Sequence, residues 1–412
     1  MKIIDAKNQK ALTKVLAHAA APDAAFDKSV AKIVHAVRDE GDTALLAFAR
    51  RFDDVRPPIE VSREEMERSM RHVPADVRAA IAAAAKNIAR VAARQVPSTF
   101  ALSVTPGVDI EQRVEPLARV GCYVPGGRFP LPSSLLMTAV PARVAGVPEI
   151  IVACPRPEPS VLAAALEAGV TRLFRIGGAH AIAALAYGTR TVPRVDKIVG
   201  PGNRWVAAAK ALVSRDCAID FYAGPTEIVI VASSGDAEWI AADLVAQAEH
   251  DPDARSIFIT WNRGLATKVS KLVAAAAKDR RVVKASIDAH GAIVIVKDAD
   301  EAVALANRIA PEHLVVDTEA LAKRTLVAGA LFVGACTAQA AGDYATGSNH
   351  VLPTAGAARF RGGLSASDFV RVMAVQRVNK KGLATLAPTI LPLARAEGLR
   401  AHGESIEIRI RK

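Results

Sequence analysis

Short apolar runs alternate with helical patterns along the middle of the chain. From residue 121 onward, the runs GCYV, EIIVACP, RLFRIGG and DKIVGPG are each followed by a stretch with apolar residues at helical spacing. A second series runs from TEIVIVAS through SIFITW and AIVIVK to ALFVG. Apolar strands that alternate with helices are typical of parallel sheets connected by right-handed crossovers. The pattern therefore predicts an α/β protein with two Rossmann-like domains.

The two ends of the chain follow other patterns. Residues 30–52 and 63–91 place apolar residues at helical spacing, and AAIAAAAKNIARVAAR is a strong helix former. Residues 99–120 alternate in short runs around Thr-Pro-Gly, which favours a small antiparallel ribbon. Beyond residue 359, FVRVMAVQRV and LAPTILPLARAEG show helical patterns, whereas the final ESIEIRIRK alternates like an edge strand.

These changes of pattern predict a division of the chain into four parts. We expect an N-terminal segment of residues 1–15, a discontinuous α/β domain of residues 16–120 with 227–357, a second α/β domain of residues 121–226, and a C-terminal tail of residues 358–412. A ligand is expected in the crevice between the domains, at the carboxyl ends of the strands. No strand is followed by GxGxxG or GxxxxGK[ST], so the usual dinucleotide fingerprint and the P-loop are absent from the sequence.

Composition narrows the class of protein. Of 412 residues, 51% are hydrophobic and 23% charged, which excludes a mainly disordered or fibrous chain. The net charge of +11 leaves a nucleic acid or an anionic substrate open as partners. The few aromatic residues do not cluster with basic ones, which argues against a reader of single-stranded nucleic acid. Four scattered cysteines without a CxxC pair, no apolar leader and no membrane helix predict a cytoplasmic protein.

Three glycine-rich turns follow predicted strands and open onto helices: YVPGG at residues 123–127, RIGG at residues 175–178 and VGPGN at residues 199–203. Backbone amides at such turns approach anionic groups closely, and a helix N-terminus favours negative charge. Glycines also simply make tight turns, and this is the commoner explanation of any single one. Three in one domain favour a phosphate-bearing ligand.

Two polar pairs lie near predicted helix ends. Gln247 and His250 are three positions apart, a spacing that puts both side chains on one helix face and that pairs of metal ligands use. A histidine at a helix end is more often a cap. Glu312 and His313 are adjacent after a proline, where a carboxylate and an imidazole serve as general bases. An acidic cap of a helix is the alternative explanation.

Polar residues also gather in a loop near the C-terminus. Residues 341–354 include Asp343, Asn349 and His350, and a loop this polar between buried patterns is more often a site than a packing feature. The alternative is a surface connection rich in turns. His402, in the tail, carries no signal of its own.

Taken in order, these motifs resemble the histidinol dehydrogenase family. The resemblance covers most of the chain and rests on QRVEPLARVGCYVPGG, MTAVPARVAGV, GGAHAIAALAYGT, VDKIVGPGN, FYAGPTE, QAEHDP, APEHL, GDYATGSNHVLPT and AEGLRAH. It implies oxidation of L-histidinol through an aldehyde to L-histidine, in histidine biosynthesis. It also implies NAD, one Zn²⁺ per subunit, and a homodimer in which the swapped tail of one subunit completes the active site of the other.

The resemblance also implies roles for individual residues. His313 would be the base that removes the alcohol proton, and Glu312 would activate the water that adds to the aldehyde. The implied zinc ligands are Gln247, His250, Asp343 and, from the other subunit, His402. Substrate contacts would be Thr226, Gln247, His250, His313, Asp343, His350, Glu397 and His402, and NAD contacts would be Tyr123, His180 and Asn203.

Three departures from the family pattern concern ligand contacts. His180 stands where glutamine is usual, Thr226 stands where serine is usual, and GGRFPLPSS replaces a typical GGKAAYPSS. Threonine keeps the hydroxyl group, whereas the His180 ring has a different shape and a possible charge. The changed loop, with Arg128, leaves an alternative function: a related enzyme that oxidises another small alcohol, such as an anionic one. Retention of Glu397 and His402 favours histidinol.

Another class of function, a non-catalytic binding protein or a basic nucleic-acid-binding module, also has to be weighed. Retention of Glu312, His313 and all four implied zinc ligands favours an enzyme. Residues 356–412 hold eleven Lys and Arg against four Asp and Glu, so most of the basic excess lies in the tail. We therefore assign this excess to a dimerising tail, with neither a nucleic acid nor a membrane as partner.

Overall fold

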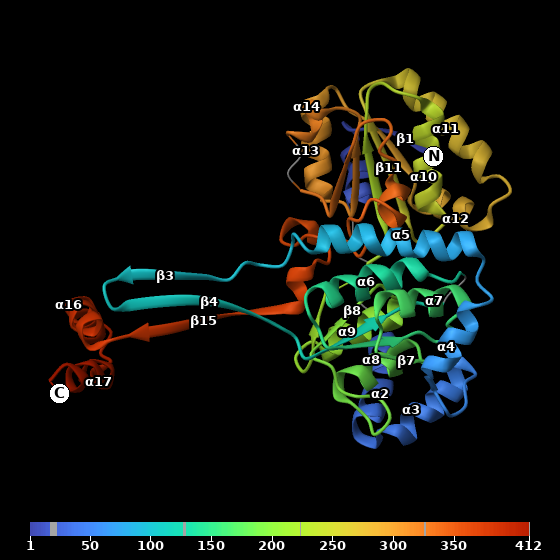
Figure 1. Cartoon of the computed structure of the whole chain (residues 1–412). Helices are drawn as coiled ribbons and strands as arrows, with labels where there is room; N and C mark the ends of the chain where they lie inside the picture. Colours follow the sequence, from blue (N-terminus) through green and yellow to red (C-terminus); the bar gives the residue numbers. More distant parts are fainter. Residues whose placement is uncertain (17–22, 127–128, 223, 325–326, 412) are drawn as a thin grey trace.

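Two sheets flanked by helices form the body of the molecule, and a long arm projects from it (Figure 1). The computed structural model describes residues 1–16, 23–126, 129–222, 224–324 and 327–411. Within these residues, sheet A has the order β1-β12-β11-β10-β13-β14, with every neighbouring pair parallel. Its strands are β1 Lys2–Asp5, β10 Glu227–Val231, β11 Arg255–Thr260, β12 Ala292–Ile295, β13 His313–Val316 and β14 Ala330–Val333.

Sheet B has the order β2-β7-β6-β5-β8-β9. All of its pairs are parallel apart from β2, which runs antiparallel to β7. Its strands are β2 Glu60–Val61, β5 Arg119–Tyr123, β6 Glu149–Ala153, β7 Arg172–Phe174, β8 Lys197–Val199 and β9 Ala218–Ile219. The first strand along the chain, β1 in sheet A and β2 in sheet B, lies at an edge of its sheet. The next strand, β10 or β5, lies near the middle, and from there the chain winds outward to one side and then returns to wind the other way. The sheets are thus doubly wound, and the α/β prediction is confirmed.

Strand burial follows from this layout. A parallel sheet with helices on both faces reads as a continuous apolar run, and all five residues of β10 are buried. Around sheet A lie α1 Gln9–Leu16, α10 Ala237–Ala248, α11 Arg263–Ala277, α12 Arg281–His290, α13 Ala299–Ile309 and α14 Glu319–Ala322. The core of this sheet also takes in Leu12 and Val15. Residues 1–15 therefore belong to sheet A through β1 and α1.

The helices of residues 24–92 pack on sheet B. Val30, Val34 and Val37 share a core with β7 and α8, and Ile81 and Ile88 share one with β5, α6 and α7. The helices around sheet B are α2 Ala24–Glu40, α3 Asp42–Phe48, α4 Arg63–Met70, α5 Ala75–Ala92, α6 Pro132–Val144, α7 Pro159–Ala168, α8 Gly178–Tyr187 and α9 Arg204–Val213, together with the π-helix η1 Ala49–Asp53. This packing differs from the predicted division, which joins residues 16–120 to residues 227–357. Helical spacing reveals an apolar face without revealing what covers it.

The arm begins as a three-stranded antiparallel sheet in the order β15-β4-β3. It consists of β3 Phe100–Thr105, β4 Val108–Pro116 and β15 Val370–Val378, followed by α16 Lys380–Ala396 and α17 Arg400–Arg411. The predicted ribbon at residues 99–120 is confirmed. The helix expected for FVRVMAVQRV is wrong, because its alternating valines pair with β4. The strand expected for ESIEIRIRK is also wrong: this segment is α17, with i,i+4 ion pairs Arg400–Glu404 and Arg411–Glu407.

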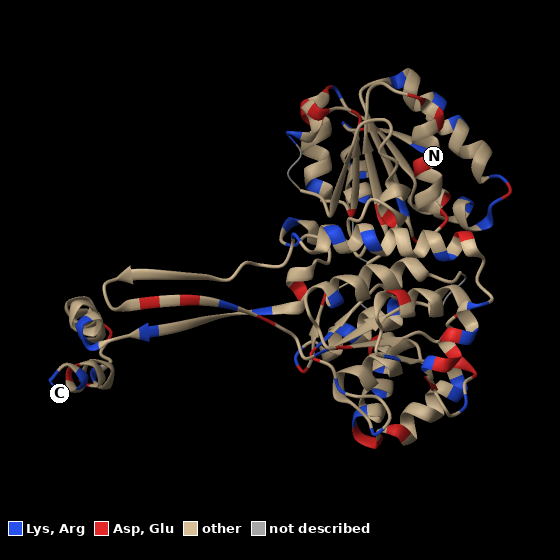
Figure 2. Cartoon of the chain, in the orientation of Figure 1, with Lys and Arg blue, Asp and Glu red and all other residues tan. Residues whose placement is uncertain are grey.

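Charge on the arm is partly paired. Figure 2 shows acidic residues along β4 and basic residues along β15, and Arg377 pairs with Glu111 at 2.7 Å between these strands. At the root of the arm, Arg361 pairs with Asp368. Part of the basic excess of the tail is therefore balanced within the fold. Among the described residues, no helix combines the length and apolar character that crossing a membrane requires.

Candidate active site

Three turns converge at the carboxyl edge of sheet B, as the glycine motifs predict. Tyr123 ends β5, and its hydroxyl accepts a hydrogen bond from the Gly178 amide of the next turn at 3.1 Å. Gly200, directly after β8, has a φ of +114° and lies so close to the Tyr123 carbonyl that a Cβ atom would meet the oxygen at 2.2 Å. Asn203 caps the N-terminus of α9, and its Oδ1 accepts hydrogen bonds from the amides of Trp205 and Val206 in the first turn of that helix. The turns thus form one backbone surface around buried Tyr123, and burial raises the pKa of its hydroxyl to about 12.

His180 lies beside the turn at residues 175–178 and shares a hydrogen-bond partner with it. Its Nε2 lies 2.7 Å from Oδ2 of Asp53, a residue far away in the sequence, and the same carboxylate oxygen accepts from the Gly177 amide at 3.1 Å. The rings of Phe48 and Phe52 lie beside the imidazole. Only 2% of the His180 side chain is exposed. Because Nε2 is bound to Asp53, direct contact of this ring with NAD stays a prediction.

The candidate catalytic residues lie at the amino edge of sheet A. β10 and β13 are neighbours, with Ile228 opposite His313, so Thr226 and Glu312 lie together just before the two strands. This corrects the expectation that the site lies at the carboxyl ends of the strands of both domains. The loop at residues 349–354 connects this edge to the carboxyl edge of sheet B. It makes three polar contacts there, two with α6 and one with Gly224: Ser134–His350, Asn349–Met137 and Gly224–Thr354.

Glu312 is buried within a set of hydrogen-bond donors. Its Oε2 accepts from Thr226 Oγ1 at 2.5 Å and from the Glu227 amide at 2.9 Å. Gln247 Nε2 donates in turn to Thr226 Oγ1 at 2.6 Å. Burial outweighs these bonds and raises the pKa of Glu312 to about 8. A carboxyl group tuned toward neutral pH is suited to general base chemistry.

His313 is held in one tautomer. Its Nδ1 lies 3.1 Å from the carbonyl oxygen of Glu227, which can only accept, so Nδ1 carries the hydrogen. Nε2 is then the basic nitrogen. Burial lowers the pKa of His313, which favours the neutral base. Glu227 itself is buried and pairs with Arg255 at 2.7 Å.

The polar loop contributes Asp343, at the end of α15 Gln339–Tyr344. Burial raises the pKa of Asp343, whereas the nearby imidazoles of His313 and His250 lower it. His350 donates from Nδ1 to the Asp343 carbonyl at 3.0 Å, and burial lowers its pKa to about 4. The structure therefore brings His250, His313, Asp343 and His350 together.

The amide oxygen of Gln247 points to a missing partner. The Gln247 side chain is buried, and its Oε1 has no hydrogen-bond partner among the described residues. A buried amide oxygen without a hydrogen-bond donor can face a cation, although zinc more commonly takes His, Cys, Asp or Glu ligands. In the described ranges, no three His, Cys, Asp and Glu side chains lie close enough to hold a metal by themselves.

Glu397 and His402 are not brought to the other site residues of the same chain. They lie at the end of α16 and in α17, at the far end of the arm, and are exposed (Figure 1). Their contribution to a partner's site stays a prediction. Arg128 of the changed loop lies outside the described residues.

Sequence reasoning missed Asp53, Glu227 and Arg255. Glu227 could have been found, because an acidic residue that opens the buried run EIVIV requires a partner. Asp53 gives no local signal, because its partner His180 is 127 positions away.

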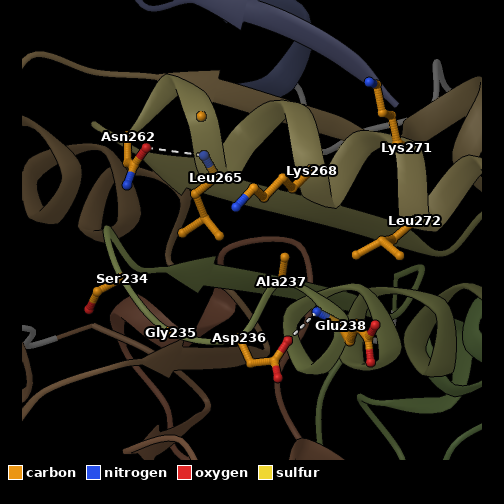
Figure 3. Close-up of a pocket in the computed structure, with 11 residues that line it drawn as sticks. Ser234, Gly235, Asp236, Ala237, Glu238, Asn262, Leu265, Lys268, Lys271 and Leu272 are labelled. Atoms are coloured by element: carbon orange, nitrogen blue, oxygen red, sulfur yellow. Dashed lines mark hydrogen bonds between the residues drawn. The ribbon is translucent and has the colours of Figure 1, made fainter.

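A surface pocket of about 690 Å³ lies at the opposite edge of sheet A, after β10 and β11 (Figure 3). This is the edge at which ligands bind in many doubly wound sheets. The helix starts beside it are already capped, with Asp236 accepting from the Glu238 amide and Asn262 from the Leu265 amide. Glu312 and His313 lie at the other end of the strands.

Comparisons with known proteins agree on one family. The family model described as histidinol dehydrogenase matches residues 17–410. A histidinol dehydrogenase of Syntrophotalea carbinolica is 45% identical, over 97% of this chain and 96% of the relative, and one of Caulobacter vibrioides is 47% identical, over 93% and 92%. The crystal structure of histidinol dehydrogenase from Elizabethkingia anophelis superimposes with a TM-score of 0.94 at 30% identity, covering 100% of this chain and 98% of that one. The chain belongs to the histidinol dehydrogenase family.

Proposed function

We propose that the protein oxidises L-histidinol through L-histidinal to L-histidine with NAD, as a cytoplasmic enzyme of histidine biosynthesis. One observation carries the proposal: Glu312 and His313 are buried side by side, and Thr226 and Gln247 form a chain of hydrogen bonds to the Glu312 carboxyl group. Membership of the family names the substrate. The turns at the carboxyl edge of sheet B are proposed to bind NAD, with Tyr123, His180 and Asn203 nearby.

Zinc is proposed to be held by Gln247, His250, Asp343 and, from the other subunit, His402. The unpartnered oxygen of Gln247 and the position of Asp343 beside His250 support this set. When bound, zinc would orient the imidazole and amino groups of the substrate, and NAD would accept hydride. Thr226, His350 and Glu397 are proposed to complete the substrate contacts.

His313 is the proposed base of the alcohol oxidation. Its Nε2 removes the proton of the substrate hydroxyl, because Nδ1 is occupied by the Glu227 carbonyl. Burial keeps the imidazole neutral and therefore able to accept that proton. Glu227 orients the ring, and Arg255 balances the buried charge of Glu227.

Glu312 is the proposed base of the aldehyde oxidation. Its carboxylate removes a proton from the water molecule whose oxygen bonds to the aldehyde carbon. Thr226 and the Glu227 amide hold Oε2 in place. These bonds fix one carboxylate oxygen, Oε2, and the other, Oε1, is proposed to act on water.

A homodimer is proposed to complete the site. In the single chain the arm leaves large apolar side chains uncovered, among them Leu102, Val104 and Leu393, each more than half exposed. Apolar surface of this kind marks a contact with another protein. A second copy on this arm would cover it and would carry Glu397 and His402 into the other body.

The test is the formation of NADH by zinc-loaded protein with L-histidinol, with L-histidinal and with a panel of small alcohols, including anionic ones. We expect both histidinol and histidinal to be oxidised and zinc removal to abolish activity. Protein that is loaded with zinc, ignores both compounds and oxidises another alcohol would refute the substrate and keep the reaction class.

A further inference from the structure

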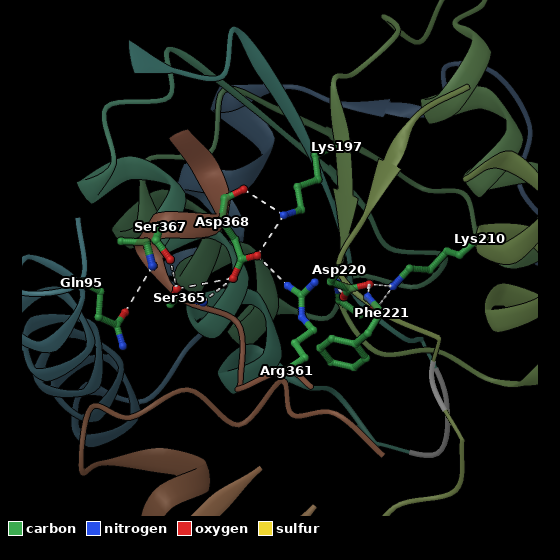
Figure 4. A network of polar contacts seen from close by, with 11 residues as sticks. Gln95, Lys197, Lys210, Asp220, Phe221, Arg361, Ser365, Ser367 and Asp368 are labelled. Carbon is green, nitrogen blue, oxygen red and sulfur yellow. Dashed lines mark hydrogen bonds and ion pairs between the residues drawn. The ribbon is translucent and has the colours of Figure 1, made fainter. Parts of the chain in front are cut away.

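A buried ion pair lies directly behind the turn that follows β8. Lys210, in α9, and Asp220, after β9, pair through Nζ and Oδ1, with side-chain exposures of 2% and 0% (Figure 4). Burial of two charges is costly, and apolar replacements of such pairs are often neutral or stabilising. Stability alone therefore does not account for this pair.

Both backbone polar groups of Gly200 are held by this pair. Asp220 Oδ2 accepts from the Gly200 amide at 2.8 Å, and Lys210 Nζ donates to the Gly200 carbonyl at 3.1 Å. Asp220 Oδ1 also accepts from the Phe221 amide at 2.7 Å, which fixes the carboxylate itself. A single ion pair thus clamps one peptide unit on each side of Gly200.

Gly200 needs such a clamp because of its position. β8 ends at Val199, so Gly200 lies just beyond the strand, with a left-handed φ of +114°. It also presses against the Tyr123 carbonyl, closely enough to exclude any side chain. The direction in which the chain leaves Gly200 decides where the amides of residues 202 and 203 and the start of α9 lie.

We propose that Lys210 and Asp220 are positioning residues for the cofactor, which fix the turn at residues 200–203 in the geometry that binds the dinucleotide. The inference rests on the proposed use of NAD at this edge of sheet B. Neither side chain is a contact to the ligand: both are buried, and their polar atoms are directed at Gly200, Phe221 and each other. They act through the backbone of the turn.

A similar pair supplies a matched control. Lys197, at the start of β8, pairs with Asp368 at 3.0 Å and is also visible in Figure 4. It has the same residue types, it is also largely buried, and it belongs to the same sheet. It lies at the amino end of β8, however, and holds the root of the arm. Removal of this pair disturbs sheet B without touching Gly200.

The experiment compares the double variant Lys210→Met/Asp220→Asn with Lys197→Met/Asp368→Asn in full-length, zinc-loaded protein. Each double variant removes both charges of its own pair, so neither member of a pair is left as a lone buried charge. In the control, Arg361 also loses the carboxylate of Asp368 but keeps the oxygen of the asparagine amide as an acceptor. NADH affinity is measured by fluorescence titration, together with zinc content, and amide exchange of residues 199–204 is followed by mass spectrometry. We expect about tenfold or greater loss of NADH affinity and faster exchange in the Lys210/Asp220 variant only, with zinc content unchanged.

Kinetics add a second readout that a purely structural role would not produce. In the Lys210/Asp220 variant, KM for NAD should rise by about the same factor as the loss of NADH affinity, while KM for histidinol stays near that of the wild type. Unchanged NADH affinity in a folded variant, or equal losses in both variants, would overturn the positioning role. Wild-type protein that fails to bind NADH would instead overturn the proposed cofactor.

Discussion

The carboxylate of Asp53 bonds to the His180 imidazole at 2.7 Å and to the Gly177 amide at 3.1 Å, so one buried side chain supports a whole turn of the proposed cofactor site. Replacement of Asp53 by alanine leaves a buried amide and a buried ring nitrogen without an acceptor. We expect a loss of about 2 kcal/mol in the free energy of unfolding and a higher KM for NAD. Urea denaturation and steady-state kinetics measure the two effects.

His180→Gln should be mild, because glutamine keeps a donor for Asp53, and a change under about 1 kcal/mol is expected. His290→Gln is the control, since His290 contacts Asp253 at an exposed position. A stable Asp53→Ala protein with unchanged KM for NAD would show that the turn at residues 175–178 keeps its geometry without Asp53.

Much of the fold can be predicted from local pattern, and the exceptions have a physical cause. Runs such as EIVIV in β10 are apolar throughout because both faces of the sheet are covered, so the strands were predictable. The packing of α2 to α5 on sheet B depends on partners distant in sequence, which periodicity does not encode. The segment FVRVMAVQRV is a strand because β4 pairs with it.

The site follows the same rule. Gln247, Glu312 and Asp343 carry chemistry recognisable in the sequence, and the fold brings them together. The edge of sheet A on which they lie was predicted wrongly, because the amino ends of β10 and β13 replace the usual carboxyl edge. Supports such as Asp53 and Asp220 are ordinary acidic residues until their partners are known.

Glu312→Gln should separate the two oxidations. The amide cannot accept a proton from water, so aldehyde oxidation should fall by about a hundredfold or more, while alcohol oxidation, assigned to His313, should be spared much more. Each step is measured with L-histidinol or L-histidinal as the starting compound. His313→Asn is the reciprocal control, with the larger loss expected in alcohol oxidation. Equal loss of both steps in Glu312→Gln would refute the division of roles.

Asp243, in α10, makes stability depend on pH. Burial raises its pKa from 3.8 to about 6. Because the folded-state pKa lies above that of the unfolded chain, the folded state binds the proton more tightly, and stability falls as pH rises through this window. Asp243→Asn should therefore stabilise the protein at pH 7 by about 1 kcal/mol, a value reduced for partial exposure, and by almost nothing near pH 4.

Urea denaturation at the two pH values provides the measurement for Asp243. The exposed Asp279 in the loop after α11 serves as the control, because Asp279→Asn should change stability little at either pH. A gain for Asp243→Asn that is equal at both pH values would exclude ionisation as its cause.

Mixed dimers test whether each active site combines one body with the arm of the other chain. One chain carries Asp343→Asn in the body, and the second carries His402→Ala in the arm; each homodimer should be inactive. In a mixed dimer of the proposed kind, one site holds both defects and the other holds neither. Random assembly on co-expression should therefore restore about a quarter of wild-type activity.

A pairing of two body variants is the control for this recovery. Co-expression of Asp343→Asn with Glu312→Gln leaves one defect in every site, because each body carries its own copy of both positions. Activity in both pairings is measured as oxidation of L-histidinal, the step that Glu312→Gln blocks, and none should return here. If sites were built within one chain, the first pairing would also stay inactive, since every site would keep a single defect. Recovery in the first pairing and none in the second therefore identifies the arm as the part that crosses between subunits.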